Sequence, residues 1–239
     1  MRRSKALPEL PLPDFGQVWL RSAAEGLMSG EVFLPDEGGN CGLFRHFCGF
    51  GFILGEPGEG FLEDVRRLMV SGNKRLVLFS KDERTAALFR QCPEIKAGKR
   101  LFFRYEGGVP EHCPELCAID RASLPELSGR VVPGVFWDSP ERFLEQGAGF
   151  MAKISGKAAG WAFSAAVSRD ELDIGVETAP GFQRQGLALR TAGEMIRYAI
   201  ETGRRPVWAC AESNEGSRKT AVKLGFVQDN WCYTFQMNK

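Results

Sequence analysis

The sequence predicts an α/β protein whose C-terminal half holds a mixed, mostly antiparallel sheet, preceded by a smaller α/β domain. Three observations indicate this class. Short apolar stretches rich in aromatic and β-branched residues alternate with segments of helical spacing. Two such stretches, 149–155 and 157–167, meet at Gly156 and are typical of an antiparallel pair. The stretch at 171–178 then runs through a glycine-containing loop into a long helix.

Strands and helices are expected to alternate along the first half. The expected helices are 14–29, 61–70 and 83–92. The apolar stretches 31–35 and 42–55 lie between the first two helices, and 75–79 and 99–106 are expected strands. Pro93 stops the third helix, because proline cannot continue a helical hydrogen-bond pattern. The pattern changes at Glu106–Pro110, a Gly/Pro-containing segment. We therefore predict an N-terminal domain over 1–108 and a second domain over 109–239.

Capping residues mark the helices of the second half. The expected helices are 138–147, 187–203 and 214–225. The expected strands are 116–119, 149–155, 157–167, 171–178, 207–210 and 226–237. Ser139 or Asp138 caps the first of these helices. Asn214 caps the last one, and Gly225 ends it in the manner of a Schellman motif.

The order strand, helix, strand occurs at 75–106 and again at 206–237, which suggests an internal repeat. The loop of the first copy carries Glu56 and Glu59, which would repel phosphate groups. Convergent α/β architecture explains the similarity nearly as well. The first domain is thus either a degenerate copy of the second or a simpler α/β module.

Composition bounds the class of protein. The chain has 239 residues, 44% of them hydrophobic and 26% charged, with a formal net charge of +1. A nearly neutral chain offers no field that attracts nucleic acid or a membrane surface, so neither is expected as a partner. The basic start MRRSK is not followed by an apolar run. We therefore expect a cytoplasmic protein.

Seven cysteines in such a chain predict reduced thiols rather than a disulfide framework. Two groups contain side chains that can bind a metal: Cys41, His46 and Cys48, and His112, Cys113 and Cys117. Neither contains a C-x-x-C pair, and a zinc site needs four well-placed ligands. No metal site is expected.

The turn Gln183–Ala188 is the main candidate for binding chemistry. It follows a strand and opens a helix, whose first backbone N–H groups have no partner within the helix. Such a helix start favours anions. Gly186 lets a bulky anion approach the main chain, and Ala188 keeps the first helical turn thin. The turn is therefore predicted to bind an anionic group.

The motif Gln-x-x-Gly-x-Ala at 183–188 resembles the acetyl-CoA loop of the GNAT-superfamily N-acetyltransferases. The pair Asn214-x-x-Ser217, followed by LGF at 224–226, resembles the second motif of that superfamily. The order of motifs from Leu116 to the C-terminus is similar to that of a bacterial branch related to the zwittermicin-resistance acetyltransferases. The resemblance implies a GNAT fold for the second domain.

The resemblance also implies the cofactor contacts. Acetyl-CoA would lie in a wedge between the fourth strand, 172–178, and the fifth, 207–210, and Gly175 would mark a bulge that helps to part them. Val176 and Thr178 would pair with pantetheine amides. The remaining implied cofactor-binding residues hold the pyrophosphate or form the second motif: Gln183, Arg184, Gln185, Gly186, Leu187, Ala188, Asn214 and Ser217.

Three residues are candidates for the chemistry. Glu177, at the end of the fourth strand, is the first candidate for the base that takes a proton from the amine, and Glu212 is the second. Cys210 is either a buried strand residue or a nucleophile. Many GNAT members place a tyrosine acid where this chain has Ala221. The thiolate of CoA can leave without such an acid, because thiols have a pKa of about 8.5.

The sequence therefore predicts an N-acetyltransferase that moves an acetyl group from acetyl-CoA to a primary amine in a ternary complex. A ping-pong route through Cys210 is the enzymatic alternative. A non-catalytic acyl-CoA sensor and a scaffold with an empty loop are the alternatives from other classes. Small amino compounds, peptide amines and aminated antibiotics all remain open as acceptors. The first domain either covers the acceptor side or mediates a homodimer contact.

Overall fold

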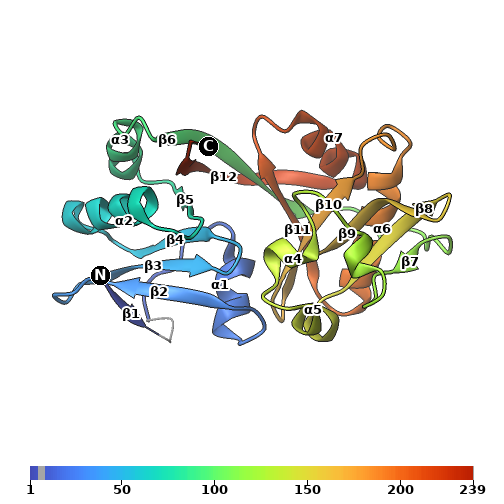
Figure 1. Ribbon diagram of the computed structural model, residues 1–239, viewed down its shortest axis with the longest axis horizontal. Coiled ribbons are helices and arrows are strands. Elements are labelled where there is room, and N and C mark those ends of the chain that lie inside the picture. The colour runs from blue at the N-terminus through green and yellow to red at the C-terminus, as the bar shows by residue number, and fades with distance from the viewer. Residues whose placement is uncertain (5–8, 239) are drawn as a thin grey trace. The chain divides into compact units, whose positions relative to one another are not determined.

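The computed structural model describes residues 1–4 and 9–238, and its contacts divide the chain into two compact units (Figure 1). Unit 1 comprises Met1–Leu101, Ala211–Ser213 and Asn230–Lys239. Unit 2 comprises Phe102–Cys210 and Asn214–Asp229. The predicted boundary between residues 108 and 109 stays a prediction about which segments fold independently.

Unit 1 is a sheet with helices packed against it. Its helices are α1 (Gln17–Ala24), α2 (Glu59–Ser71) and α3 (Glu83–Arg90). Its strands are β1 (Arg2–Ser4), β2 (Gly30–Leu34), β3 (Cys41–His46), β4 (Phe50–Gly55) and β5 (Val77–Ser80), with parts of β6 (Ile95–Tyr105) and β12 (Phe226–Met237). They follow the order β1-β2-β3-β4-β5-β12-β6. Val65 of α2 and Phe89 of α3 pack in one buried cluster with Leu78 of β5.

The first helix is shorter than the predicted range of 14–29. It begins after Gly16, whose φ of 59° is left-handed, and it ends before Gly26, whose φ is 73°. Glycine is the residue that adopts this conformation at little cost. The apolar pattern extended into these turns, but the backbone there cannot be helical.

Unit 1 and unit 2 share an order of strands and helices. In unit 1, β4 passes through α2 to a parallel partner, β5, and then to α3 and β6. In unit 2, β10 (Glu171–Thr178) passes through α6 (Leu187–Glu201) to a parallel partner, β11 (Arg205–Ala211), and then to α7 (Glu215–Leu224) and β12. Both parallel pairings extend over only three residues of each strand.

Unit 2 is a mixed sheet, as predicted. Its remaining strands are β7 (Cys117–Ala118), β8 (Gly149–Ile154) and β9 (Lys157–Val167), in the order β6-β11-β10-β9-β8-β7. β8 and β9 are antiparallel, as are β9 and β10. The helices preceding β8 are α5 (Pro140–Gln146), capped by Ser139 as expected, and α4 (Pro133–Phe136), which was not predicted.

The long helix α6 packs against β8, β9 and β10 through its apolar stripe. Ala192, Met195 and Ala199 are fully buried on this face. Burial of such a stripe is the main source of stability for an amphipathic helix. No helix in the described ranges is both long and apolar enough to cross a membrane.

Glu194 is a charged residue that is 1% exposed on α6, and its carboxylate holds a distant loop. It accepts hydrogen bonds from His112 Nδ1 at 2.9 Å, from the Cys113 amide at 3.0 Å and from Arg197 Nε at 3.1 Å. Burial alone would raise the pKa of Glu194, but these hydrogen bonds outweigh it and hold the pKa below its ordinary value of 4.5. The loop at 112–113 is thereby attached to the helix that opens at Gly186.

We expect Glu194→Gln to lower the free energy of unfolding by about 2 kcal/mol at pH 7, because hydrogen bonds to a charged acceptor are lost. A carboxyl whose pKa is depressed on folding contributes stability above its unfolded pKa, and this stability is lost as the pH falls. The difference between wild type and variant should therefore shrink below about pH 4.5. Urea unfolding at pH 7 and pH 4 measures it.

The matched control is Glu201→Gln. Glu201 bonds the same Arg197 but is exposed, so this change should cost less than about 0.5 kcal/mol. Equal effects of the two variants would contradict the anchoring role of Glu194.

Candidate functional site

The parallel strands β10 and β11 separate soon after they begin. They pair only at Glu171–Asp173 of β10 and Arg205–Val207 of β11. β10 continues to Thr178 with β9 as its partner on the other side. From Ile174 onward, one backbone edge of β10 therefore has no strand partner within the described chain. This confirms the predicted separation and places Val176 and Thr178 in the parted segment.

The bulge predicted at Gly175 is wrong. The register of β9 and β10 shifts between Asp173 and Ile174, and Gly175 pairs regularly with Phe163. A Cβ at Gly175 would lie 3.0 Å from the Phe163 ring and 3.2 Å from the Cβ of Ala165. The Phe163 ring thus leaves little space for a side chain at Gly175. The shift in strand register lies earlier, between Asp173 and Ile174.

The loop before α6 has the backbone geometry of an anion cradle. Arg184 has φ 62° and Gly186 has φ 76°, so two residues of a short turn are left-handed. Such turns direct successive N–H groups to one side. Leu189 and Arg190 donate to the Gly186 carbonyl, whereas the amides of Gly186, Leu187 and Ala188 donate no hydrogen bond within the described residues.

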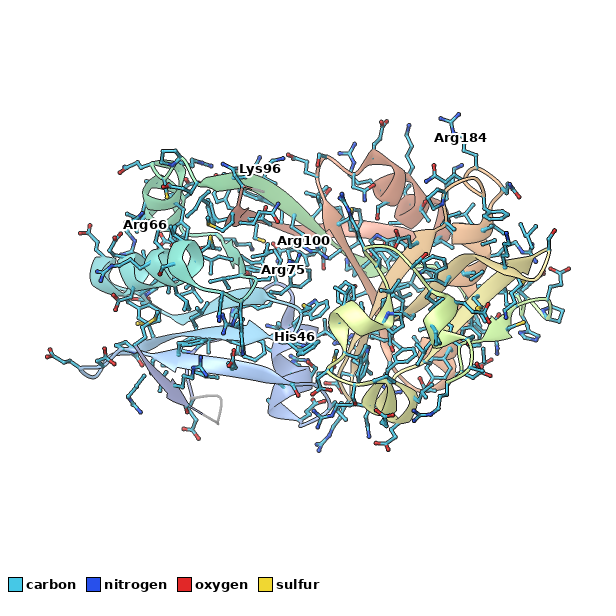
Figure 2. All side chains as sticks on the ribbon, in the orientation of Figure 1. His46, Arg66, Arg75, Lys96, Arg100 and Arg184 are labelled. Atoms are coloured by element: carbon cyan, nitrogen blue, oxygen red, sulfur yellow. The ribbon has the colours of Figure 1, made fainter. Side chains whose placement is uncertain are left out.

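A left-handed conformation is unfavourable for a residue with a side chain, so Arg184 is a strained position of the kind found at binding sites. Gln183, Arg184 and Gln185 are all exposed. Figure 2 shows the Arg184 side chain pointing away from the ribbon. The loop therefore offers unpaired amides and an exposed positive charge.

The second predicted motif forms the start of α7. Asn214 Oδ1 accepts from the Ser217 amide at 3.1 Å, and Ser217 Oγ accepts from Trp208 Nε1 at 3.0 Å. Asn214 therefore caps α7, and Ser217 joins α7 to β11. Ala221 is fully buried on the same helix, and alanine has no hydroxyl. Gly225, with φ 98°, ends the helix as predicted.

Glu177 makes a contact that the sequence did not predict. Its carboxylate accepts from the amide of Val131 at 2.7 Å and from that of Arg130 at 3.3 Å. Trp161, the strand partner of Glu177 on β9, donates its Nε1 to the Val131 carbonyl at 2.8 Å. A Cβ at Gly129 would lie 2.3–2.5 Å from the Glu177 carboxylate. Two paired side chains thus hold the 129–131 loop at the parted end of β10.

The other two catalytic candidates, Cys210 and Glu212, differ in exposure. Cys210 is 5% exposed on β11 of unit 2. Glu212 is exposed, its amide donates to the Lys99 carbonyl, and its contacts assign it to unit 1. Tyr198 packs on Phe150, so its ring is part of the α6 and β8 contact.

All seven cysteines are free thiols. Among the described residues, no group of three or more His, Cys, Asp or Glu side chains is arranged to hold a metal ion. In the first of the two sequence clusters, His46 Nδ1 and Cys48 Sγ are 3.2 Å apart and buried. In the second, His112 and the amide of Cys113 serve the Glu194 anchor instead.

A family model described as GNAT acetyltransferase matches residues 14–235 of the sequence. The chain belongs to this family. A search of curated proteins found none that matches the sequence. The match extends over both units, so the GNAT model describes the first half of the chain as well as the second.

Solved structures share the fold of this GNAT chain at low identity. A GCN5-related N-acetyltransferase-like protein from Streptococcus suis has a TM-score of 0.77 at 20% identity, over 94% of each chain. A GNAT-family protein from Novosphingobium aromaticivorans has a TM-score of 0.64 at 17% identity, over 97% of this chain and 98% of that one. A tandem GNAT protein of clavulanic acid biosynthesis has 0.53 at 15%, over 88% and 83%.

The attachment of the 129–131 loop can be tested without any ligand. We expect Glu177→Ala to increase the rate of trypsin cleavage after Arg130 at least about tenfold, because the loop loses both acceptors of its amides. Glu177→Gln keeps one acceptor oxygen and should lie between wild type and alanine. Limited proteolysis with mass spectrometry locates the cut.

The control for this experiment is Glu171→Ala, at the start of the same strand, where the carboxylate meets the exposed Arg205. Its cleavage after Arg130 should match that of wild type. Resistance of the Glu177→Ala protein to trypsin at this site would contradict the attachment of the 129–131 loop by Glu177.

Proposed function

We propose that this GNAT chain is an acetyl-CoA-dependent N-acetyltransferase that transfers an acetyl group directly to a primary amine in a ternary complex. The observation that carries the proposal is the combination of the parted strands β10 and β11 with the unpaired amides of Gly186, Leu187 and Ala188. A nucleotide thioester needs both features, because its diphosphate seeks N–H donors and its extended arm seeks a free strand edge.

The residues present fit this cofactor. The left-handed turn at Arg184 and Gly186 would receive the pyrophosphate, and Gln183, Gln185, Leu187 and Ala188 complete the turn. A Cβ at Gly186 would meet nothing within 4 Å, so space is open on the side where an anion would approach. Bound acetyl-CoA supplies an activated thioester. The backbone edge at Val176 and Thr178 would hold its pantetheine arm, and α7 with Asn214 and Ser217 would close the far side of the wedge.

We assign the proton transfer to Glu177, with Glu212 as the second candidate. An alkylamine is protonated at neutral pH, with a pKa near that of lysine, so a base is needed before the nitrogen can attack. Glu177 lies on the parted segment of β10, where the reacting atoms are expected. No tyrosine acid is proposed, because Ala221 occupies its position. Transfer through a Cys210 thioester is the alternative route within the enzyme class.

Two observations favour a second candidate function, a non-catalytic acyl-CoA sensor. Ala221 removes the usual acid, and the oxygens of Glu177 already accept from two backbone amides. The sensor binds CoA and transfers nothing to any amine. The order of motifs supports a likeness to the zwittermicin-resistance branch. The proposal also includes a cytoplasmic location and a homodimer contact through unit 1.

Thermal unfolding with acetyl-CoA tests the cofactor site. A ligand at 100 times its Kd stabilises by about 2.7 kcal/mol, which should raise the Tm by about 5 °C or more. Gly186→Glu should abolish this shift, because it places a negative side chain in the anion cradle. The measurement is the Tm difference with and without acetyl-CoA.

The chain offers a matched control at the other end of α6. Gly203 has φ 75°, close to the 76° of Gly186, and a Cβ there also meets nothing within 4 Å. Gly203→Glu should therefore suffer the same backbone strain and keep the full shift. A Gly186→Glu protein that still responds to acetyl-CoA like wild type would refute the loop assignment.

The base assignment is tested by Glu177→Gln in an acetyl-transfer assay. We expect kcat to fall about 10²-fold or more with an unchanged KM for acetyl-CoA, because glutamine cannot take the proton. Trypsin resistance at Arg130 shows whether the loop stays attached in the same variant. Full activity of Glu177→Gln would transfer the base role to Glu212, and acetylation of Cys210 in the absence of acceptor would favour the covalent route.

A further inference from the structure

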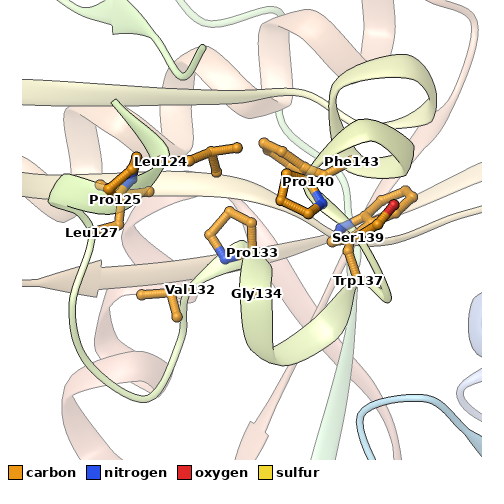
Figure 3. A pocket seen from close by; sticks show the side chains of 10 residues that line it. All are labelled: Leu124, Pro125, Leu127, Val132, Pro133, Gly134, Trp137, Ser139, Pro140 and Phe143. Carbon is orange, nitrogen blue, oxygen red and sulfur yellow. The ribbon is translucent and has the colours of Figure 1, made fainter. Parts of the chain in front are cut away.

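Unit 2 contains a cavity of about 280 Å³ between the 3₁₀ turn at Leu124–Glu126 and the helices α4 and α5. Figure 3 shows the side chains around it. No lining residue is charged, and the lining is dominated by proline, aliphatic and aromatic side chains: Leu124, Pro125, Leu127, Val132, Pro133, Gly134, Trp137, Ser139, Pro140 and Phe143. The proposed function leaves this cavity unassigned.

The two polar side chains of the lining are already engaged. Trp137 donates its Nε1 to the Ser164 carbonyl at 2.8 Å, and Ser139 Oγ accepts from the Arg142 amide as the cap of α5. A charged or strongly polar group placed here would lose its hydration without gaining a charged partner. An apolar group would leave water and gain contacts. The chemistry of the lining therefore selects apolar ligands.

The cavity adjoins the parted end of β10. Val132 lines the cavity, and the preceding residue, Val131, donates its amide to Glu177 at 2.7 Å. Consecutive Cα atoms are 3.8 Å apart, so one residue of backbone separates the wall from the Glu177 contact. Trp161 holds the Val131 carbonyl at the same point. One lining residue, Val132, thus directly follows the residue that Glu177 and Trp161 hold.

The size of the cavity fits part of a small molecule. An engineered apolar cavity of about 150 Å³ holds one benzene molecule, and whole drug-sized ligands take pockets of about 300–1,000 Å³. At about 280 Å³, this cavity accommodates one or two rings, or an alkyl chain of similar volume. The rest of such a ligand, including a polar amine, would lie outside.

We propose that this cavity receives the apolar part of the acceptor, so that the acceptor is a primary amine joined to an uncharged aliphatic or aromatic group. The inference rests on the proposed acetyl transfer and narrows its substrate class. Amines whose remaining groups are charged or rich in hydroxyls are poor acceptors, because nothing in the lining replaces their water.

A homologous series of amines tests the proposal. With acetyl-CoA saturating, kcat/KM should rise about fourfold for each CH₂ from ethylamine through butylamine to hexylamine, the gain expected for burying a methylene group. The diamine 1,4-diaminobutane should fall below butylamine, because its second ammonium group would enter the cavity. A flat series, or a diamine as good as butylamine, overturns the proposal.

Gly134→Leu tests the location. Gly134 lines the cavity, and a Cβ there meets nothing within 4 Å, so the larger residue should be accepted by the fold. The chain-length dependence should flatten, with kcat/KM for hexylamine falling toward that for ethylamine. Gly108→Leu is the control, because Gly108 also has open space at its Cβ and lies outside the lining. An unaltered series in Gly134→Leu, with the Tm of the variant preserved, overturns the assignment to this cavity.

A binding measurement separates failure of this inference from failure of the proposed function. Saturation-transfer NMR of the CoA-free protein should show signal transfer to hexylamine but not to ethylamine, and Gly134→Leu should remove it. Transfer to hexylamine without acetylation of any amine supports the cavity and refutes the enzyme. Acetylation without chain-length dependence and without NMR transfer supports the enzyme and refutes the cavity.

Discussion

The end of hydrogen bonding between β10 and β11 is the constraint on which the rest of unit 2 depends. Three residues of each strand pair in parallel, and the two strands then separate while β10 stays paired with β9 as far as Thr178. A backbone edge that lacks a partner is costly inside a protein, so it must meet water or a ligand. β10 ends at Thr178, and the chain reaches the left-handed turn at Arg184 and Gly186 before α6 begins. The free edge and the unpaired amides thus lie on either side of one loop in the sequence of unit 2.

The side chains of one β9–β10 pair extend this surface to a loop. Glu177 and Trp161 are strand partners, and both reach Val131, one through its amide and the other through its carbonyl. A main-chain segment bound at both its donor and its acceptor has little freedom. The next residue after this segment, Val132, lines the apolar cavity. The residue that we propose as the base thus also positions the loop that precedes the proposed acceptor cavity, and the two roles are separable by experiment.

The two units share an order of elements but differ in the loop before the first helix of that order. Both have a strand, a helix, a parallel strand paired over three residues, and a second helix. In unit 2 the residue before α6 is Gly186 in a left-handed conformation, whereas in unit 1 the residue before α2 is Gly58 in an extended conformation. Glu56 and Glu59 flank that position. The geometry and the charge of the unit 1 loop both disfavour an anion there.

Features that depend on neighbouring residues could be predicted from the sequence. The caps at Ser139 and Asn214 and the end of α7 at Gly225 are set by contacts within a few positions. How remote segments meet is visible only in the folded chain. The Val131–Glu177 and His112–Glu194 bonds join residues 46 and 82 positions apart. The bulge predicted at Gly175 is wrong because the ring of Phe163, which limits the space there, lies on another strand. No local pattern contains that information.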